Sequence, residues 1–252
     1  MKRCLLYLVL ALGLLSSCNT ELRLAKNFVQ KYAPTRAAVY FPEKADVTLI
    51  QYKDGSYSNV LDSLNQDAFL DIIYAAYAEE LRTYGVDVYV PDDPDNVQVD
   101  SLHWLILLSK VEIQGYYKDY VDHVFDLVDE NDYIFPLNTV NVASWFDIND
   151  GEWGKTAYFE DERGDRFSSH VTGFGSDCTY HYSISPLLND DIYNYAVYLG
   201  KIYAKYTYDC MMNRYIAAEM KKMGDTLDCR LRYDPRRGSM EYIEDEDGFI
   251  EF

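Results

Sequence analysis

The sequence predicts an α+β fold, in which a small mixed or antiparallel sheet packs against one helix and a long, tyrosine-rich C-terminal helix. Apolar residues recur at three- and four-residue steps along Gln66–Tyr84, which indicates an amphipathic helix. The segment Leu187–Met223 carries a helical apolar face that several tyrosines widen, so a helix there would be buried on more than one side. Thr139–Ile148 and Trp153–Phe159 alternate in polarity and are joined through Asp150-Gly151, which is a strong hairpin signal.

The predicted helices have recognisable ends. Asn65 is placed to cap the first long helix, and Gly85 sits where such a helix commonly stops. Gly224 ends the tyrosine-rich helix in the same way. A shorter helix is expected within Asn19–Ala33, and Pro34 ends it because the residue before proline avoids the helical region.

The remaining segments divide into strands and irregular chain. Ala37–Phe41 and Val47–Tyr52 are expected as strands, and Pro42 between them indicates a bend or a sheet edge. Tyr120–Val128 fits a strand or a short helix equally well. Glu160–Ser185 is rich in Gly, Ser and charge and is expected to be irregular. The other predicted strands are Val86–Val90, His103–Tyr117 and Leu227–Tyr233.

The first eighteen residues have the layout of an export signal. Lys2 and Arg3 precede the apolar run Leu5–Leu15, which has the length of a signal-peptide core and is too short to span a bilayer. The run closes with Leu15-Ser16-Ser17-Cys18, which resembles the lipobox of bacterial lipoproteins. That resemblance implies a signal peptide of residues 1–17, cleaved before Cys18, and acylation of Cys18. An ordinary cleaved signal with a chance cysteine is the alternative.

The same resemblance predicts where the protein resides. Three acyl chains on Cys18 would hold the mature chain on a membrane, since each buried methylene contributes about 0.8 kcal/mol. Asn19 stands where an aspartate can retain lipoproteins in the inner membrane, so we expect the outer membrane, on its periplasmic face. Residues 18–36 are then the lipid anchor, linker and short helix, residues 37–240 a single α+β domain, and residues 241–252 an acidic tail.

Charge and cysteine content restrict the partners. The 252 residues carry a formal net charge of −19, which becomes −21 when Lys2 and Arg3 leave with the signal. A charge of this sign repels nucleic acid, whose binding depends on basic contacts to phosphate. Cys178, Cys210 and Cys229 remain after Cys18 is lipidated, and an odd number allows at most one intramolecular disulfide.

The middle of the chain resembles a second group of proteins. The order of strand, helix ending in glycine, long apolar strand and late hairpin over Ala37–Glu160 is similar to small envelope lipoproteins. These include the penicillin-binding-protein activators, the curli-secretion lipoprotein and the TolB amino-terminal domain. Phe146–Glu152 stands in place of their late strand, whereas Tyr120–Asn138 and the tyrosine-rich helix depart from the pattern. The resemblance implies partner binding in the envelope and offers no catalytic residues to transfer.

The sequence contains no assembled catalytic or metal motif. Cys178-x-x-His181 has ligand spacing, with His170 as a third candidate, but zinc sites use three or four ligands, so loop residues are the favoured interpretation. Gly173–Ser176 lacks the second glycine of a serine-hydrolase elbow. Pro91–Asp100 is acidic without the glycine and distal glutamate of an EF-hand, so we expect a solvated loop. We assign neither a cofactor nor a metal site.

These observations favour a membrane-anchored envelope lipoprotein with a non-catalytic, partner-binding or assembly role. The anchor residue is Cys18, and the expected partner is another envelope protein. The alternative is a lipid-anchored hydrolase or glycan-binding protein that uses the aromatic segment Tyr133–Trp153. In that case Trp145 and Trp153 are the candidate ligand-stacking residues, because their rings are amphipathic. Calcium binding through Pro91–Asp100 is a third hypothesis.

Overall fold

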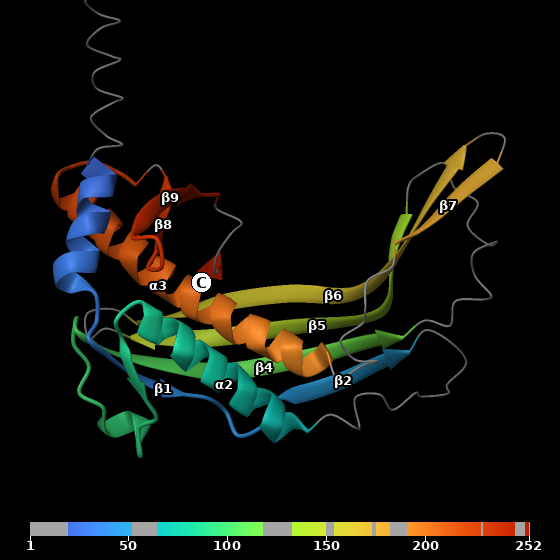
Figure 1. Ribbon diagram of the computed structural model, residues 1–252, viewed down its shortest axis with the longest axis horizontal. Coiled ribbons are helices and arrows are strands. Elements are labelled where there is room, and N and C mark those ends of the chain that lie inside the picture. The colour runs from blue at the N-terminus through green and yellow to red at the C-terminus, as the bar shows by residue number, and fades with distance from the viewer. Residues whose placement is uncertain are drawn as a thin grey trace, which may run out of the picture.

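The computed structural model describes residues 20–51, 65–117, 133–149, 154–172, 175–181, 191–227, 229–244 and 250–251. It confirms the α+β class, with a mixed sheet, the predicted amphipathic helix and the long tyrosine-rich helix (Figure 1). The predicted signal peptide, Cys18, Trp153 and the ambiguous segment Tyr120–Val128 lie outside the described residues.

The main sheet has eight strands in the order β10-β6-β5-β4-β1-β3, with β2 on β4 and β7 on β6. Strands β1, β3 and β2 run parallel to their neighbours, and the pairs from β4 through β5, β6, β7 and β10 are antiparallel. Two further strands, β8 and β9, form a separate hairpin. The strand bounds are β1 Arg36–Tyr40, β2 Asp46–Gln51, β3 Asp87–Tyr89, β4 His103–Tyr117, β5 Tyr133–Asn149, β6 Gly154–Thr172, β7 Gly175–His181, β8 Arg230–Asp234, β9 Ser239–Ile243 and β10 Ile250–Glu251.

The break expected at Pro42 is present. Strand β1 pairs with residues 103–107 of β4, and β2 pairs with residues 112–117 of the same strand. The two short strands thus follow one after the other along β4. Proline cannot donate a ladder hydrogen bond, which explains why the pairing stops there.

The helices lie where the sequence places them. Residues 20–27 are helical and continue into η1 (Phe28–Tyr32), and α2 (Gln66–Thr83) and α3 (Asp191–Lys222) are the two long helices. Asn65 caps α2, its side-chain oxygen accepting from the backbone nitrogen of Ala68 at 3.1 Å. Gly85 and Gly224 follow the two helices with φ of 85° and 78°, as their predicted role requires. A short 3₁₀ turn, η3 (Pro94–Asn96), follows β3.

Both long helices cover the same face of the sheet and contact each other (Figure 1). Their backbones approach closely at Gly200, where an added Cβ would lie 2.4 Å from the carbonyl oxygen of Ile73. The core between helices and sheet contains Trp104, Phe146 and Tyr203, each essentially inaccessible to solvent. No helix in the described ranges is long and apolar enough to cross a membrane.

Two buried tyrosines, one on each long helix, have hydroxyl groups with partners in the core, whereas the buried hydroxyl of Tyr208 on α3 has none among the described residues. The Tyr203 hydroxyl hydrogen-bonds the hydroxyl of Ser144 on β5. Between the helices, Tyr77 of α2 donates to Thr207 of α3 at 3.1 Å. A buried tyrosine with a paired hydroxyl contributes a large apolar surface without an unsatisfied polar group.

The expectation that Glu160–Ser185 is irregular was wrong. Strand β6 continues to Thr172, and β7 follows from Gly175 to His181. Neither α2 nor α3 covers this part of the sheet (Figure 1), so the sequence there need not alternate apolar with polar residues. The backbone ladder alone defines these strands. Within residues 241–252, expected as an acidic tail, β9 extends to Ile243 and β10 pairs with β6.

Candidate functional site

Trp145 is the predicted ligand-stacking residue that the structure describes. It lies on β5 between Ser144 and Phe146, which both contact Tyr203 of α3. Successive side chains of a strand point to opposite faces, so Trp145 points away from the helices. Its side chain is half-buried on a sheet face that neither α2 nor α3 covers (Figure 1).

Trp145 stands in the middle of a row of side chains that crosses three strands. The register pairs it with Lys110 on β4 and with Tyr158 on β6. The Lys110 ammonium lies 4.8 Å from the centre of the Trp145 ring, and the Tyr158 ring centre lies 5.1 Å away. Directly opposed residues on one face of a sheet interact in this way, so the ladder fixes the geometry of the row.

A second row places carboxylates beside the aromatic row. Glu112 on β4 forms an ion pair with Lys110, and the Glu160 carboxylate on β6 accepts from Tyr158 Oη at 2.6 Å. Asn141 donates to the other Glu160 oxygen at 2.5 Å. We call Lys110, Glu112, Trp145, Tyr158 and Glu160 together the Trp145 patch.

The protonation of the patch follows from these contacts. The hydrogen bond with Glu112 raises the pKa of Lys110, so its ammonium stays charged at neutral pH. Partial burial, followed by the hydrogen bond and charge of Glu160, raises the pKa of the Tyr158 hydroxyl. Tyr158 therefore stays a neutral donor. The patch offers aromatic surface, one cation and two carboxylates, a combination suited to binding a peptide or a sugar ring.

Two hollows lie elsewhere on the surface. One, of about 490 Å³, lies where β1 leads into β2 beside the start of α2; its lining includes Glu43, Lys44, Asp67 and Asp71. The other, of about 730 Å³, lies between the N-terminal helix and the end of α3. The acidic loop Pro91–Asp100 is folded on itself, because Asp93 accepts from the backbone nitrogen of Asp95 at 3.0 Å. Within the described ranges, no three His, Cys, Asp or Glu residues gather as a metal site.

A buried ion pair holds the β8–β9 hairpin onto α3. Asp209 of α3 accepts from Arg232 of β8 at 2.6 Å, and both side chains are at most 4% exposed. Beside them, Asn213 of α3 pairs with the backbone of Leu231 like a neighbouring strand, its oxygen accepting at 2.8 Å and its nitrogen donating at 2.7 Å. This cluster cannot meet a ligand without unfolding, so its role is structural.

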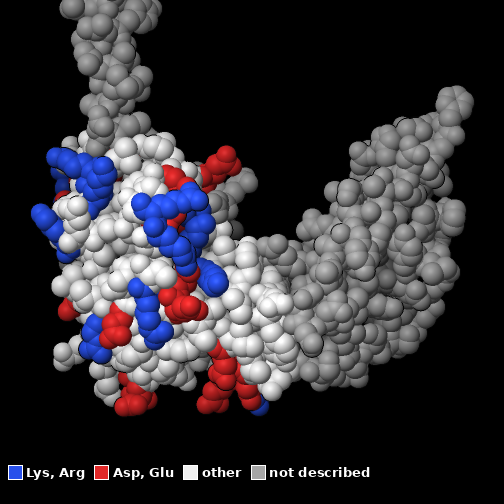
Figure 2. All heavy atoms as spheres, viewed as in Figure 1, with Lys and Arg blue, Asp and Glu red and all other residues white. Residues whose placement is uncertain are grey.

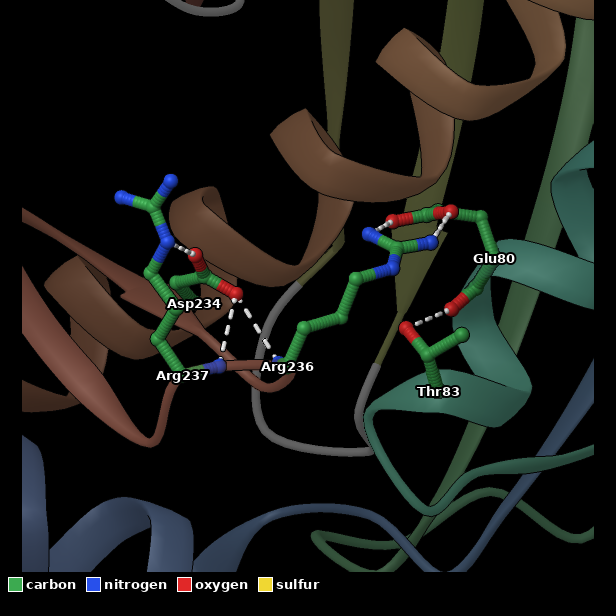
Figure 3. Close-up of polar contacts among 5 residues, drawn as sticks. All are labelled: Glu80, Thr83, Asp234, Arg236 and Arg237. Atoms are coloured by element: carbon green, nitrogen blue, oxygen red, sulfur yellow. Dashed lines mark hydrogen bonds and ion pairs between the residues drawn. The ribbon is translucent and has the colours of Figure 1, made fainter.

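A second ion pair holds the hairpin turn (Figure 3). Arg236 donates from two guanidinium nitrogens to the two carboxylate oxygens of Glu80 on α2, at 2.8 and 2.5 Å. Asp234 shapes the turn by accepting from the backbone nitrogens of Arg236 and Arg237 at 2.9 and 3.2 Å. Asp234-Pro235 followed by Gly238, which has a φ of 62°, is a turn signal that predicts this hairpin, and the sequence analysis missed it.

The described cysteines do not form a disulfide. Cys210 is buried and Cys229 is exposed. The side chains of Cys178, His170 and His181 lie outside the described part of the structure. The described site residues that the sequence analysis missed are Lys110, Tyr158 and the two glutamates of the patch.

Comparison with known proteins identifies no family for this chain. No protein family matches the sequence, and no curated protein matches it. Among solved structures, a putative neuraminyllactose-binding hemagglutinin homolog from Helicobacter pylori is similar at 13% identity and a TM-score of 0.35, covering 75% of this chain and 95% of that one. A protein described as uncharacterized is similar at 11% identity and a TM-score of 0.29, covering 68% and 89%.

Proposed function

We propose that the chain is a membrane-anchored envelope lipoprotein that binds another envelope protein and performs no catalysis. The anchor is Cys18, acylated after removal of residues 1–17, and the membrane is the outer membrane on its periplasmic side. The basic residues, apolar run and lipobox-like ending of the first eighteen residues support the anchor.

The observation that carries the binding role is the Trp145 patch. A half-buried tryptophan held between a lysine and a tyrosine presents a rigid aromatic surface, and tryptophan and tyrosine dominate the binding energy of protein interfaces. The ion pair and hydrogen bonds of the patch already orient its side chains, so binding would order few of them. Among the described elements, neither α2 nor α3 lies on this face of the sheet, which leaves a partner access to the patch (Figure 1).

Crosslinking of intact cells tests the proposal. Cells expressing the full chain are compared with Trp145→Ala, with Tyr242→Ala as a matched control at a tyrosine that is 48% exposed on the β8–β9 hairpin. We expect one abundant envelope protein to be recovered with the native chain and with the control. Recovery with Trp145→Ala should fall about 30-fold, as expected for an aromatic hot spot worth ~2 kcal/mol. Equal recovery of the partner with both variants would show that the Trp145 patch is not its binding site.

A glycan ligand is the second candidate, and the paired rings of Trp145 and Tyr158 favour it. Aromatic rings stack on sugars, and the neighbouring carboxylate of Glu160 can accept from hydroxyl groups. A panel of envelope glycans added to the purified chain should change tryptophan emission if one binds. The measurement is made in a Trp153→Phe background, where the change must disappear on adding Trp145→Phe, because the remaining Trp104 is buried and cannot report surface binding. A panel without any change contradicts this candidate.

A further inference from the structure

The N-terminal helix is fixed to the far end of α3. The Phe28 ring packs edge-on against Tyr208 at 5.7 Å, and Tyr32 stacks on Tyr215 with ring centres 4.9 Å apart. The Asn27 amide also donates to the Tyr215 hydroxyl at 2.9 Å. Two segments far apart in the sequence thus form one end of the molecule (Figure 1).

This end is basic although the chain as a whole is strongly acidic. Figure 2 shows lysine and arginine gathered over the N-terminal helix and the neighbouring hairpin. Three acidic residues lie here: Glu21 is 1% exposed, Glu219 pairs with Lys222 at 2.6 Å, and Asp225 is exposed, so the five exposed basic residues of this end outnumber its acidic residues by two. The exposed basic side chains, which we call the basic end, are Arg23, Lys26, Lys31, Lys221 and Lys222.

A groove and an apolar side chain accompany these charges. The groove of about 730 Å³ is lined by Arg23, Lys26 and Lys31 from one helix, by Glu219 of the other and by Met223 after it, so three basic side chains stand against one carboxylate. Met223 is 53% exposed and lies beside these basic side chains. Basic side chains around an exposed apolar one are typical of surfaces that lie in the membrane interface.

Covalent geometry places the basic end beside the predicted anchor. The described helical residues include Thr20, two residues after Cys18. Two residues span at most about 7 Å, so an acylated Cys18 would hold the first helical turn at the level of the lipid headgroups. Arg23 and Lys26 follow within the first two turns of that helix.

We propose that the basic end docks on anionic phospholipid headgroups, with the groove of Arg23, Lys26 and Lys31 receiving phosphate and Met223 entering the interface. The proposal rests on the lipid anchor of the proposed function and adds a second contact with the same membrane. One anchor point leaves the domain free to turn, whereas two contacts fix its orientation. The acidic remainder of the surface is repelled by the same headgroups and faces away.

Vesicle binding tests the docking without the anchor. A chain that begins at residue 19 contains every described element and contact, and cosedimentation measures its partition onto vesicles. We expect binding to phosphatidylcholine vesicles that contain phosphatidylglycerol, none to phosphatidylcholine alone, and loss of binding at high salt. Neutralising two basic residues in Arg23→Gln/Lys26→Gln should lower the partition coefficient about 25-fold, because each basic residue near an anionic surface is worth about fivefold.

A matched variant controls for net charge. Lys44→Gln/Lys201→Gln removes two exposed charges away from the basic end, and its partition coefficient should stay within about twofold of the parent. Equal losses in both variants, or equal binding to the two kinds of vesicle, would overturn the docking proposal. Acylation is measured separately, from the mass of the N-terminal peptide of membrane-expressed protein. Docking without acylation would refute only the anchor, and acylation without docking only the basic end.

Discussion

The free energy of unfolding should fall as the pH rises towards neutrality because Asp209 is buried. Its side chain is 0% exposed, one carboxylate oxygen accepts from Arg232 at 2.6 Å, and Oδ1 has no partner among the described residues. Burial raises the pKa of Asp209 from 3.8 to about 7, although the Arg232 guanidinium lowers it. Desolvation of the carboxylate thus exceeds its attraction to the arginine, a balance known for buried ion pairs.

The direction and the magnitude of this change in the free energy of unfolding follow from proton linkage. The folded state binds the Asp209 proton more tightly than the unfolded state does. The contribution of this proton to the free energy of unfolding is therefore complete below pH 4 and is lost as the pH rises to about 7. The whole interval from 3.8 to about 7 corresponds to about 4 kcal/mol, of which about 3 kcal/mol lies between pH 5 and pH 8.

The variant Asp209→Asn isolates this contribution. Asparagine resembles the protonated acid and does not titrate, so the difference in free energy of unfolding between variant and native protein removes all other titrating groups. Urea unfolding of both proteins is measured at pH 5 and at pH 8. On going from pH 5 to pH 8, the free energy of unfolding of the variant should increase by about 3 kcal/mol relative to that of the native protein. Asp87→Asn, at a side chain that is 71% exposed, controls for the substitution itself. A variant that is less stable at pH 8 by about 3–5 kcal/mol would refute the reasoning, because the ion pair would then outweigh desolvation.

Three further predictions concern the packing of the helices and the hairpin. Gly200→Ala should lower the free energy of unfolding by about 1–3 kcal/mol or more in urea titrations, because the new methyl group meets the Ile73 carbonyl at 2.4 Å. Asn65→Ala should cost about 1 kcal/mol through the lost cap of α2, and Asn65→Ser should restore most of it. Arg236→Lys should speed amide hydrogen exchange in the β8–β9 hairpin without unfolding the core, because lysine cannot donate to both oxygens of Glu80 in the same bidentate geometry. Unchanged exchange would contradict this role of the ion pair.

The elements that could be predicted are those whose local signals agree with their surroundings. The Asn65 cap, the glycines after both helices and the tyrosine-rich face of α3 each depend on a few neighbouring residues, and all are present. The part of β6 beyond Phe159 and the whole of β7 could not be predicted, because their pairing with β5 and with β6 respectively defines them, and this pairing is not a local property of the sequence. The ion pair of Asp209 with Arg232 could not be predicted either, since an acidic chain offers many carboxylates and only the fold determines which of them are buried.

The geometry of the Trp145 patch depends on one break in the alternation of apolar and polar residues along β4, and this break is visible in the sequence. The apolar residues of β4 that face the helices are Trp104, Ile106 and Leu108, and then Val111 and Ile113. The step from 108 to 111 breaks the two-residue alternation, and the structure has a bulge between Leu108 and Lys110. A bulge inserts one residue, so it returns Val111 to the buried face.

The same bulge determines which side chain meets the tryptophan. With uninterrupted pairing, Phe146 opposite Leu108 would place Ser109 opposite Trp145 and turn Lys110 towards the helices. The bulge instead pairs Lys110 with Trp145, and Ser109 donates its hydroxyl to the Trp145 carbonyl at 3.1 Å. Core packing therefore assembles the patch: the break that keeps the apolar residues of β4 buried also brings the lysine to the tryptophan. Such a phase break beside a half-buried aromatic residue is a signal that sequence analysis can use to locate a candidate binding surface.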